Sequence, residues 1–143
     1  MKYILILLLF GCSYKAKISY VIDGDTVITS TGERIRLANI DCPEHNQLFG
    51  AQATQFTRYY LQGQTVTLKT HGKDKYHRTI ADIYLSDNRY FNQMIIKAGL
   101  CYVYAQYAPD SLFKDELTAK QNKVGLWALN SISPYQFRKQ IKK

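Results

Sequence analysis

The sequence predicts an α+β fold dominated by a β-barrel. Five short segments rich in β-branched residues are spaced between residues 18 and 85. One amphipathic helical segment separates the third strand from the fourth, and two more follow the fifth. This order of elements is that of a five-stranded OB-type barrel with three helices.

The first three strands are expected to form a meander. Residues 18–22 are rich in β-branched side chains, and the Asp-Gly-Asp sequence at 23–25 is a turn signal before the strand at 26–29. A Thr-Gly turn then leads into a third strand over 34–40, in which apolar residues alternate with arginines. One face of this strand therefore belongs to the core and the other to the surface.

A helix and two further strands complete the predicted barrel. Apolar residues recur at helical spacing between residues 49 and 60, and Gly63 should end that helix; they are Phe49, Ala53, Phe56 and Tyr60. Residues 65–69 alternate as a strand, a polar segment follows, and residues 80–85 form the strand that pairs with it.

Two helices follow the last strand. The first, over residues 91–98, has one apolar face and ends at Gly99. The second, over residues 110–123, is expected to direct Phe113 and Leu117 toward the core.

The chain length and its segments predict one folded domain. Its 143 residues suffice for a single ordinary core, which we assign to residues 18–130. Residues 1–17 are interpreted as a signal peptide with a short linker, and residues 131–143 as a mobile basic tail.

The charge balance favours an anionic partner. The net charge is +8 and the isoelectric point is near 9.4. Nucleic acid is the first candidate, because Lys and Arg side chains that neutralise phosphates release counterions. An anionic membrane surface would attract the same charge. Composition alone leaves both open.

The N-terminus predicts export. Lys2 precedes an apolar run over residues 3–10, and polar residues follow Cys12, in the order of a secretory signal peptide. The Leu-Phe-Gly-Cys sequence that ends at Cys12 is similar to a bacterial lipobox, in which the cysteine becomes the lipidated first residue. The alternatives are a plain cleaved signal peptide and a short uncleaved anchor. The expected location is the cell envelope, as a lipoprotein, or the exterior.

Three cysteines occur in the chain. With Cys12 assigned to lipidation, Cys42 and Cys101 are free to pair in an oxidising compartment, but nothing in the sequence shows that they are close. None of the three has the spacing of a zinc site.

Three carboxylates stand where strands meet turns, and two arginines are the accompanying basic candidates. Asp25, Asp41 and Glu44 would suit a hard cation such as Ca²⁺, although an acid beside Gly or Pro usually only caps a turn. Arg36 and Arg78 would supply the positive donors that phosphoryl chemistry needs, although each alone is more readily interpreted as a solvated strand or loop residue.

Four sequence motifs that occur in a fixed order favour the functional interpretation of these residues. The sequence contains VIDGDTV at 21–27, RLANIDCPE at 36–44, DKYHR at 74–78 and GLW at 125–127. In order and spacing they strongly resemble the staphylococcal (micrococcal) nuclease family, whose members are OB-fold nucleases. The resemblance extends from about residue 18 to residue 127.

The resemblance implies a role for each motif residue. Asp25 and Asp41 would be direct ligands of one Ca²⁺ ion, together with the backbone carbonyl of Cys42. Glu44 would activate the attacking water as general base, and Arg36 and Arg78 would hold the phosphate. DNA and RNA would both be cleaved, leaving 3′-phosphate ends.

The resemblance also implies substrate contacts. Lys75 and Tyr76 match family positions that hold a terminal phosphate. Tyr104 and Tyr107, with Tyr102 nearby, form an aromatic cluster on which a base could stack, and the alternative is that these tyrosines pack the core. We expect a monomer that binds nucleic acid, with the membrane as a second partner through a lipid anchor.

Departures from the family pattern mark what is in doubt. Cys42 replaces Thr, and His77 replaces Gly in the turn that presents Arg78. The segment 45–50 is shorter than in the best-known member. The rival function is an OB-fold lipoprotein that binds nucleic acid without cleaving it.

Overall fold

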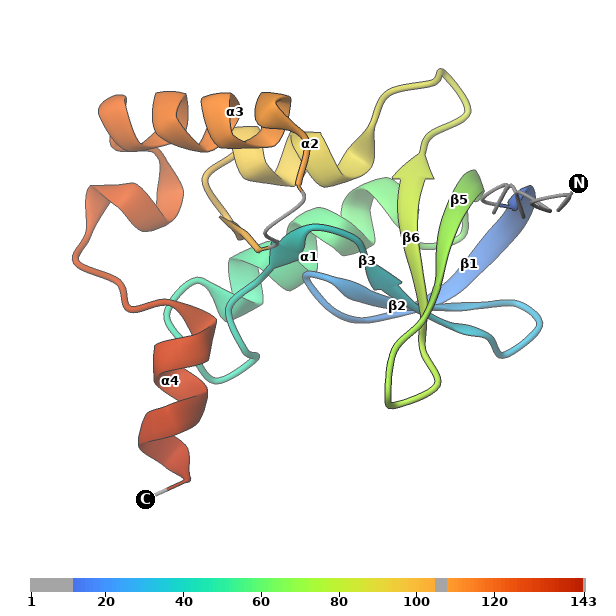
Figure 1. Cartoon of the computed structure of the whole chain (residues 1–143), viewed down its shortest axis with the longest axis horizontal. Coiled ribbons are helices and arrows are strands. Elements are labelled where there is room, and N and C mark those ends of the chain that lie inside the picture. Colours follow the sequence, from blue (N-terminus) through green and yellow to red (C-terminus); the bar gives the residue numbers. More distant parts are fainter. Residues whose placement is uncertain (1–11, 105–107, 143) are drawn as a thin grey trace, which may run out of the picture.

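The computed structural model describes residues 12–104 and 108–142, and it confirms the predicted barrel. The barrel strands are β1 (Ser13–Asp23), β2 (Thr26–Thr29), β3 (Arg34–Leu37), β5 (Thr65–Lys73) and β6 (Thr79–Tyr84). They close in the order β1-β2-β3-β6-β5 (Figure 1). The pairs are antiparallel except for β3 and β6, which run parallel.

Strand β1 begins five residues before the predicted strand at 18–22. Its first part pairs with β5, from Ser13 opposite Lys69 to Lys17 opposite Thr65. Tyr14 and Ala16 pack against the core while Lys15 and Lys17 are exposed, so the strand alternation continues to the start of β1. The exposed lysines made this part of the strand resemble a polar linker.

The predicted strand at 34–40 is divided in two. Strand β3 ends at Leu37, and Asn39 takes a left-handed conformation with φ 63°. The chain then forms β4 (Ile40–Asp41), which leaves the barrel and pairs with β7 (Tyr102–Val103). Asparagine tolerates this conformation better than most residues, and the break turns the following residues toward the mouth of the barrel.

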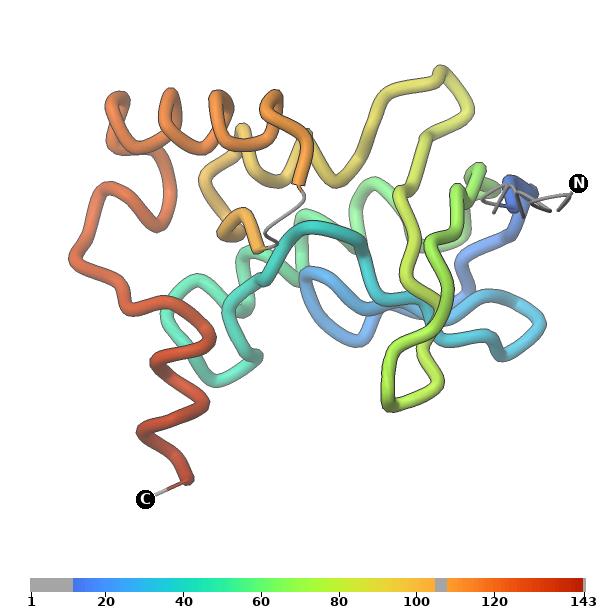
Figure 2. Tube along the Cα trace, viewed as in Figure 1, coloured from blue at the N-terminus to red at the C-terminus, as the bar shows by residue number. Residues whose placement is uncertain are grey.

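Three helices lie where the sequence predicts them. They are α1 (Gly50–Leu61), α2 (Phe91–Lys97) and α3 (Asp110–Gln121). Figures 1 and 2 show α2 and α3 side by side. Helix α2 also contacts strand β6, and α1 packs against β1. No helix among residues 12–104 and 108–142 is both long and apolar enough to cross a bilayer.

The prediction for the inner face of α3 is wrong. Phe113 and Leu117 are 44% and 55% exposed, and the buried side chains are Leu112 and Ala119. Polar contacts fix this rotation, because Asp115 accepts a hydrogen bond from Gln93 and Glu116 accepts one from the backbone of β7. Apolar residues occur on both faces of α3, so helical periodicity alone does not determine which face is buried.

The C-terminal segment contains helices that the prediction of three lacked. A short 3₁₀ helix, η1 (Gly125–Ala128), is followed by α4 (Pro134–Ile141), which occupies the segment interpreted as a mobile tail. Ser133 caps α4, Pro134 stands in its first turn, and Gln136 completes a capping box. These are standard start signals for a helix.

A disulfide joins the barrel end to the helical part of the molecule. Cys42 follows β4 and Cys101 precedes β7, and the two are bonded. The sequence left this pairing open. Cys12, outside the disulfide, is exposed, and its carbonyl oxygen accepts hydrogen bonds from the backbone and hydroxyl of Thr70.

Candidate active site

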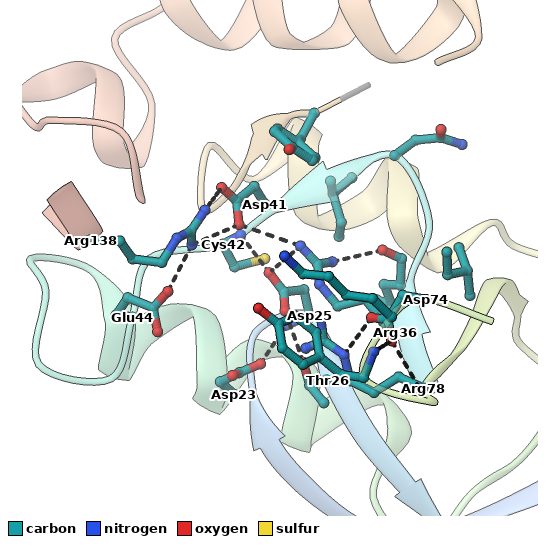
Figure 3. A pocket seen from close by; sticks show the side chains of 17 residues that line it. Asp23, Asp25, Thr26, Arg36, Asp41, Cys42, Glu44, Asp74, Arg78 and Arg138 are labelled. Atoms are coloured by element: carbon teal, nitrogen blue, oxygen red, sulfur yellow. Dashed lines mark hydrogen bonds and ion pairs between the residues drawn. The ribbon is translucent and has the colours of Figure 1, made fainter. Parts of the chain in front are cut away.

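A cavity of about 680 Å³ at the mouth of the barrel brings the predicted site residues together (Figure 3). Its lining includes every residue predicted to bind the metal or act on the phosphate: Asp25, Arg36, Asp41, Cys42, Glu44 and Arg78. The predicted substrate contacts Lys75, Tyr76 and Tyr104 line it as well. Tyr107 lies outside the described residues.

Asp25 is buried at the turn between β1 and β2. One carboxylate oxygen accepts a hydrogen bond from the Thr26 hydroxyl, and the other accepts one from the backbone N–H of Cys42 at 2.7 Å. Burial raises the pKa of Asp25 to about 7, although the positive charge of Arg36 opposes that rise. A cation beside this carboxylate would favour its charged form.

Gly24 permits the close approach of this turn to the disulfide. A Cβ at Gly24 would lie 2.8 Å from the Cβ of Cys42 and 2.9 Å from that of Ala53. Both neighbours are fixed to the backbone, so neither can yield without moving an element. A glycine at position 24 is thus required by packing as well as favoured by the turn.

Arg36 lies between two acids. Its Nη2 is 3.3 Å from Asp25 Oδ2 and 3.4 Å from Asp41 Oδ1, and its Nη1 donates to the carbonyl of Leu37 at 2.8 Å. Arg36 stands on β3 and Asp41 on β4, and the chain break at Asn39 separates these two strands. Its guanidinium is therefore held in place by protein groups.

A third arginine, Arg138, enters the site from α4, and the sequence interpretation missed it. Its Nη2 lies 2.9 Å from Asp41 Oδ2, and its Nη1 lies 2.8 Å from Glu44 Oε1. Hydrogen bonds to Asp41 and Glu44 raise the pKa of Arg138 further above its usual value, against the opposing effect of burial. No local signal distinguishes Arg138 from the other basic residues near the C-terminus.

Arg78 is presented by the turn between β5 and β6. Its Nε lies 2.7 Å from Asp74 Oδ2, while Asp74 Oδ1 accepts the backbone N–H groups of Tyr76 and Arg78. Partial burial acts to raise the pKa of Asp74, but the hydrogen bonds from Arg78 lower it below its usual value. His77 takes a left-handed φ of 62°, so the turn keeps the conformation that a Gly would adopt easily.

Aromatic side chains border the cavity. Tyr76 is 66% exposed, with the Lys75 ammonium 5.1 Å and the Arg78 guanidinium 5.4 Å from its ring centre. Tyr104 is also exposed and available to a ligand. Tyr102 is not, because its ring packs edge-on against Trp127 with the centroids 4.9 Å apart.

The donor groups fit a hard divalent cation. Asp25 and Asp41 present carboxylates on either side of Arg36 Nη2. Cys42, whose carbonyl is the third predicted ligand, directly follows Asp41 and also lines the cavity. Within the described part of the chain, no three His, Cys, Asp or Glu side chains are close enough to form a site by themselves. A cation held here would therefore rely on two carboxylates, a main-chain oxygen and oxygens from water or substrate, which is chemistry typical of Ca²⁺.

Comparisons with known proteins agree with the geometry. The model of the family described as "Staphylococcal nuclease homologue" matches residues 34–129. An "Uncharacterized endonuclease" of Escherichia coli O157:H7 is 35% identical over 82% of this chain and 80% of its own length. The "Thermonuclease" of Staphylococcus intermedius is 41% identical over 63% of this chain and 58% of its own length. The "Micrococcal nuclease" of Shigella flexneri is 26% identical over 90% of this chain and 83% of its own length.

Proposed function

The chain belongs to the staphylococcal nuclease family and is a nuclease, and from that premise we propose that it is a calcium-dependent endonuclease acting outside the cytoplasm. The observation that carries the proposal is the single cavity into which Asp25, Asp41, Glu44, Arg36 and Arg78 all project. Its substrates are DNA and RNA, and the products carry 3′-phosphate ends.

The two barrel arginines bind the scissile phosphate. Arg36 stands on β3, and Arg78 directly precedes β6, the strand that pairs with β3. As water attacks phosphorus, negative charge grows on the non-bridging oxygens, and guanidinium donors already held in place stabilise it without rearrangement. Removing one such donor costs roughly 10²- to 10³-fold in rate.

Glu44 takes the proton from the attacking water. Its side chain is 37% exposed, so both water and a phosphodiester have access to the carboxylate. A positioned general base contributes about 10²- to 10⁴-fold. The bond between phosphorus and the 5′ oxygen then breaks, the 5′ oxygen takes up a proton from water and leaves as a hydroxyl, and the phosphate stays on the 3′ side.

Calcium would be held by Asp25, Asp41 and the Cys42 carbonyl. When bound there, it supplies positive charge that stabilises the negative charge developing on the phosphate. Lys75 and Tyr76 bind a terminal phosphate of the substrate, and a base stacking on Tyr104 would contribute about 1–3 kcal/mol.

Cleavage of plasmid DNA by the purified segment 13–143 tests the activity. We expect degradation with calcium and none after a calcium chelator is added. Glu44→Gln should reduce the rate by about 10²-fold or more. Asp87→Asn is the matched control, because Asp87 is exposed and its side chain pairs with Arg89 within its own turn, away from the cavity at the barrel mouth. Undiminished cleavage by Glu44→Gln would refute the role of Glu44.

We propose that Cys12 is the lipid-modified first residue of the mature protein and that the protein is a monomer in the cell envelope. The apolar run before Cys12 supports this. Mass spectrometry of membrane-extracted protein should find an acylated Cys12, and an unmodified Cys12 at the mature terminus would contradict it. Light scattering of the segment 13–143 should give the mass of one chain.

A further inference from the structure

Helix α4 reaches the active site although it lies beyond the matched family region. The family match ends at residue 129, and α4 covers Pro134–Ile141. Figure 3 shows Arg138 approaching Asp41 and Glu44 from the side opposite Arg36. A residue outside the family region thus touches the general base that we propose.

Glu44 has little other support. It lies in the segment between β4 and α1, without regular secondary structure. Within residues 12–104 and 108–142, the Glu44 carboxylate accepts one hydrogen bond, which comes from Arg138 Nη1. A glutamate has three side-chain torsions, so without a partner its carboxylate would sample many positions. Arg138 Nη1 also lies 3.3 Å from Asp41 Oδ1, which links the base to a proposed metal ligand.

The segment that leads into α4 is held by partly buried hydrogen bonds. The buried side chain of Gln47 donates to the carbonyl of Ile132 at 2.7 Å, and its oxygen accepts the backbone N–H of Glu44. The Tyr102 hydroxyl lies 3.3 Å from the carbonyls of Ser131 and Ile132. One glutamine therefore ties the backbone of the base to the segment that leads into α4.

We propose that Arg138 is a positioning residue of the nuclease, which orients the Glu44 carboxylate relative to Asp41 and acts on the rate through Glu44. The inference rests on the proposed role of Glu44 as general base. Both amino groups of Arg138 are engaged by carboxylates. Its guanidinium fork matches two carboxylates at once, which a lysine ammonium does not.

A purely structural role for Arg138 fits the contacts less well. The helix has its own start signals in Ser133, Pro134 and Gln136, and the Arg138 side chain is 40% exposed. Its contacts in the cavity are with Asp41 and Glu44, not with the core. Loss of the side chain should therefore change catalysis more than folding.

The test measures kcat and KM on a fluorogenic DNA oligonucleotide at saturating calcium. Four proteins form a double-mutant cycle: wild type, Arg138→Ala, Glu44→Gln and the double variant. We expect Arg138→Ala to lower kcat by about 10- to 100-fold with KM changed less than about threefold, because misplacement of a catalytic group is costly. In the Glu44→Gln background, the same change should lower kcat by less than about twofold.

Two further variants separate position from charge. Lys139→Ala removes a neighbouring positive charge that lies 4.5 Å from the centre of the Tyr135 ring, and it should leave kcat unchanged. Arg138→Lys keeps the charge without the fork and should recover only part of the lost rate. Urea unfolding should give the same midpoint for Arg138→Ala and Lys139→Ala.

Equal losses from Arg138→Ala with and without Glu44 would overturn the proposal, since they would mean that Arg138 acts independently of the base. An unchanged or higher kcat would overturn it as well and would make the contact an obstruction. If wild type itself fails to cleave, the proposed function is wrong, which is a different result from wild-type cleavage that is insensitive to Arg138.

Discussion

Replacing Arg36 with Met should destabilise the protein, and calcium should recover part of the loss. Arg36 is the positive charge between Asp25 and Asp41, whose side chains are 9% and 7% exposed. Methionine keeps much of the length of the side chain and removes the charge and the hydrogen bond to Leu37. Removing one partner of a buried ion pair costs about 3–5 kcal/mol, because the remaining charge is left unpaired.

The assay is urea unfolding followed by the fluorescence of Trp127, the single tryptophan of the chain. Trp127 packs against Tyr102 beside the segment that leads to α4, so it reports on the loss of the native structure around the site. Calcium at a hundredfold excess over its Kd contributes about 2.7 kcal/mol to the stability of a protein that binds it only when folded. The calcium-dependent gain should be larger in Arg36→Met than in wild type, because Asp25 loses its arginine in the variant while Asp41 keeps only Arg138.

Arg89→Met is the matched control for this experiment. Arg89 pairs with Asp87, and both side chains are more than half exposed. An exposed pair of this kind contributes about 0–1 kcal/mol, so the control should unfold close to wild type. Equal losses in Arg36→Met and Arg89→Met, or a variant that does not respond to calcium, would refute the reasoning about the charges around Asp25.

Three further outcomes are expected. Arg78→Ala should lower kcat by about 10²- to 10³-fold in steady-state cleavage, and an effect confined to KM would contradict its role at the transition state. Replacing Cys42 and Cys101 by Ser should cost about 4 kcal/mol in urea unfolding, because the disulfide closes a loop with a sequence separation of 59; a cost under about 1 kcal/mol would contradict this. Burial and the hydrogen bond to Asp82 raise the pKa of Tyr90 far above its usual value. The stability that Tyr90 contributes through this shift is complete below the unfolded pKa near 10 and is lost as the pH rises above that value. In Tyr90→Phe, the free energy of unfolding should therefore fall less with increasing pH in that range than it does in wild type.

The barrel could be predicted because its signals are local. Turn residues such as Gly24 and the alternation within each strand specify strands one at a time, and their order fits few architectures. The break at Asn39 could not be predicted in this way, because the residues around it keep the alternation of a strand. It depends on the pairing of β4 with β7, which comes from a segment more than sixty residues later.

The site was predictable as far as the motifs extend. Asp25, Arg36 and Arg78 stand at turns and strand ends, where the fold fixes their direction, and all line the cavity. Arg138 stood in a basic run with no motif around it, and its partners Asp41 and Glu44 are 97 and 94 residues away. Contacts at such separations depend on where the last helix docks, which local patterns do not specify.

The pairing of charges explains how a cavity rich in arginines stays ordered before a phosphate arrives. Arg36 is held by Asp25 and Asp41, and Arg78 is held by Asp74. Arg138 is held by Asp41 and Glu44. Each guanidinium is thus fixed by an acid rather than left to solvent, so its orientation does not have to be established during the reaction. The same acids include the proposed metal ligands and base. Charge pairing and catalytic geometry are therefore one arrangement, and a substitution at any of these residues changes both.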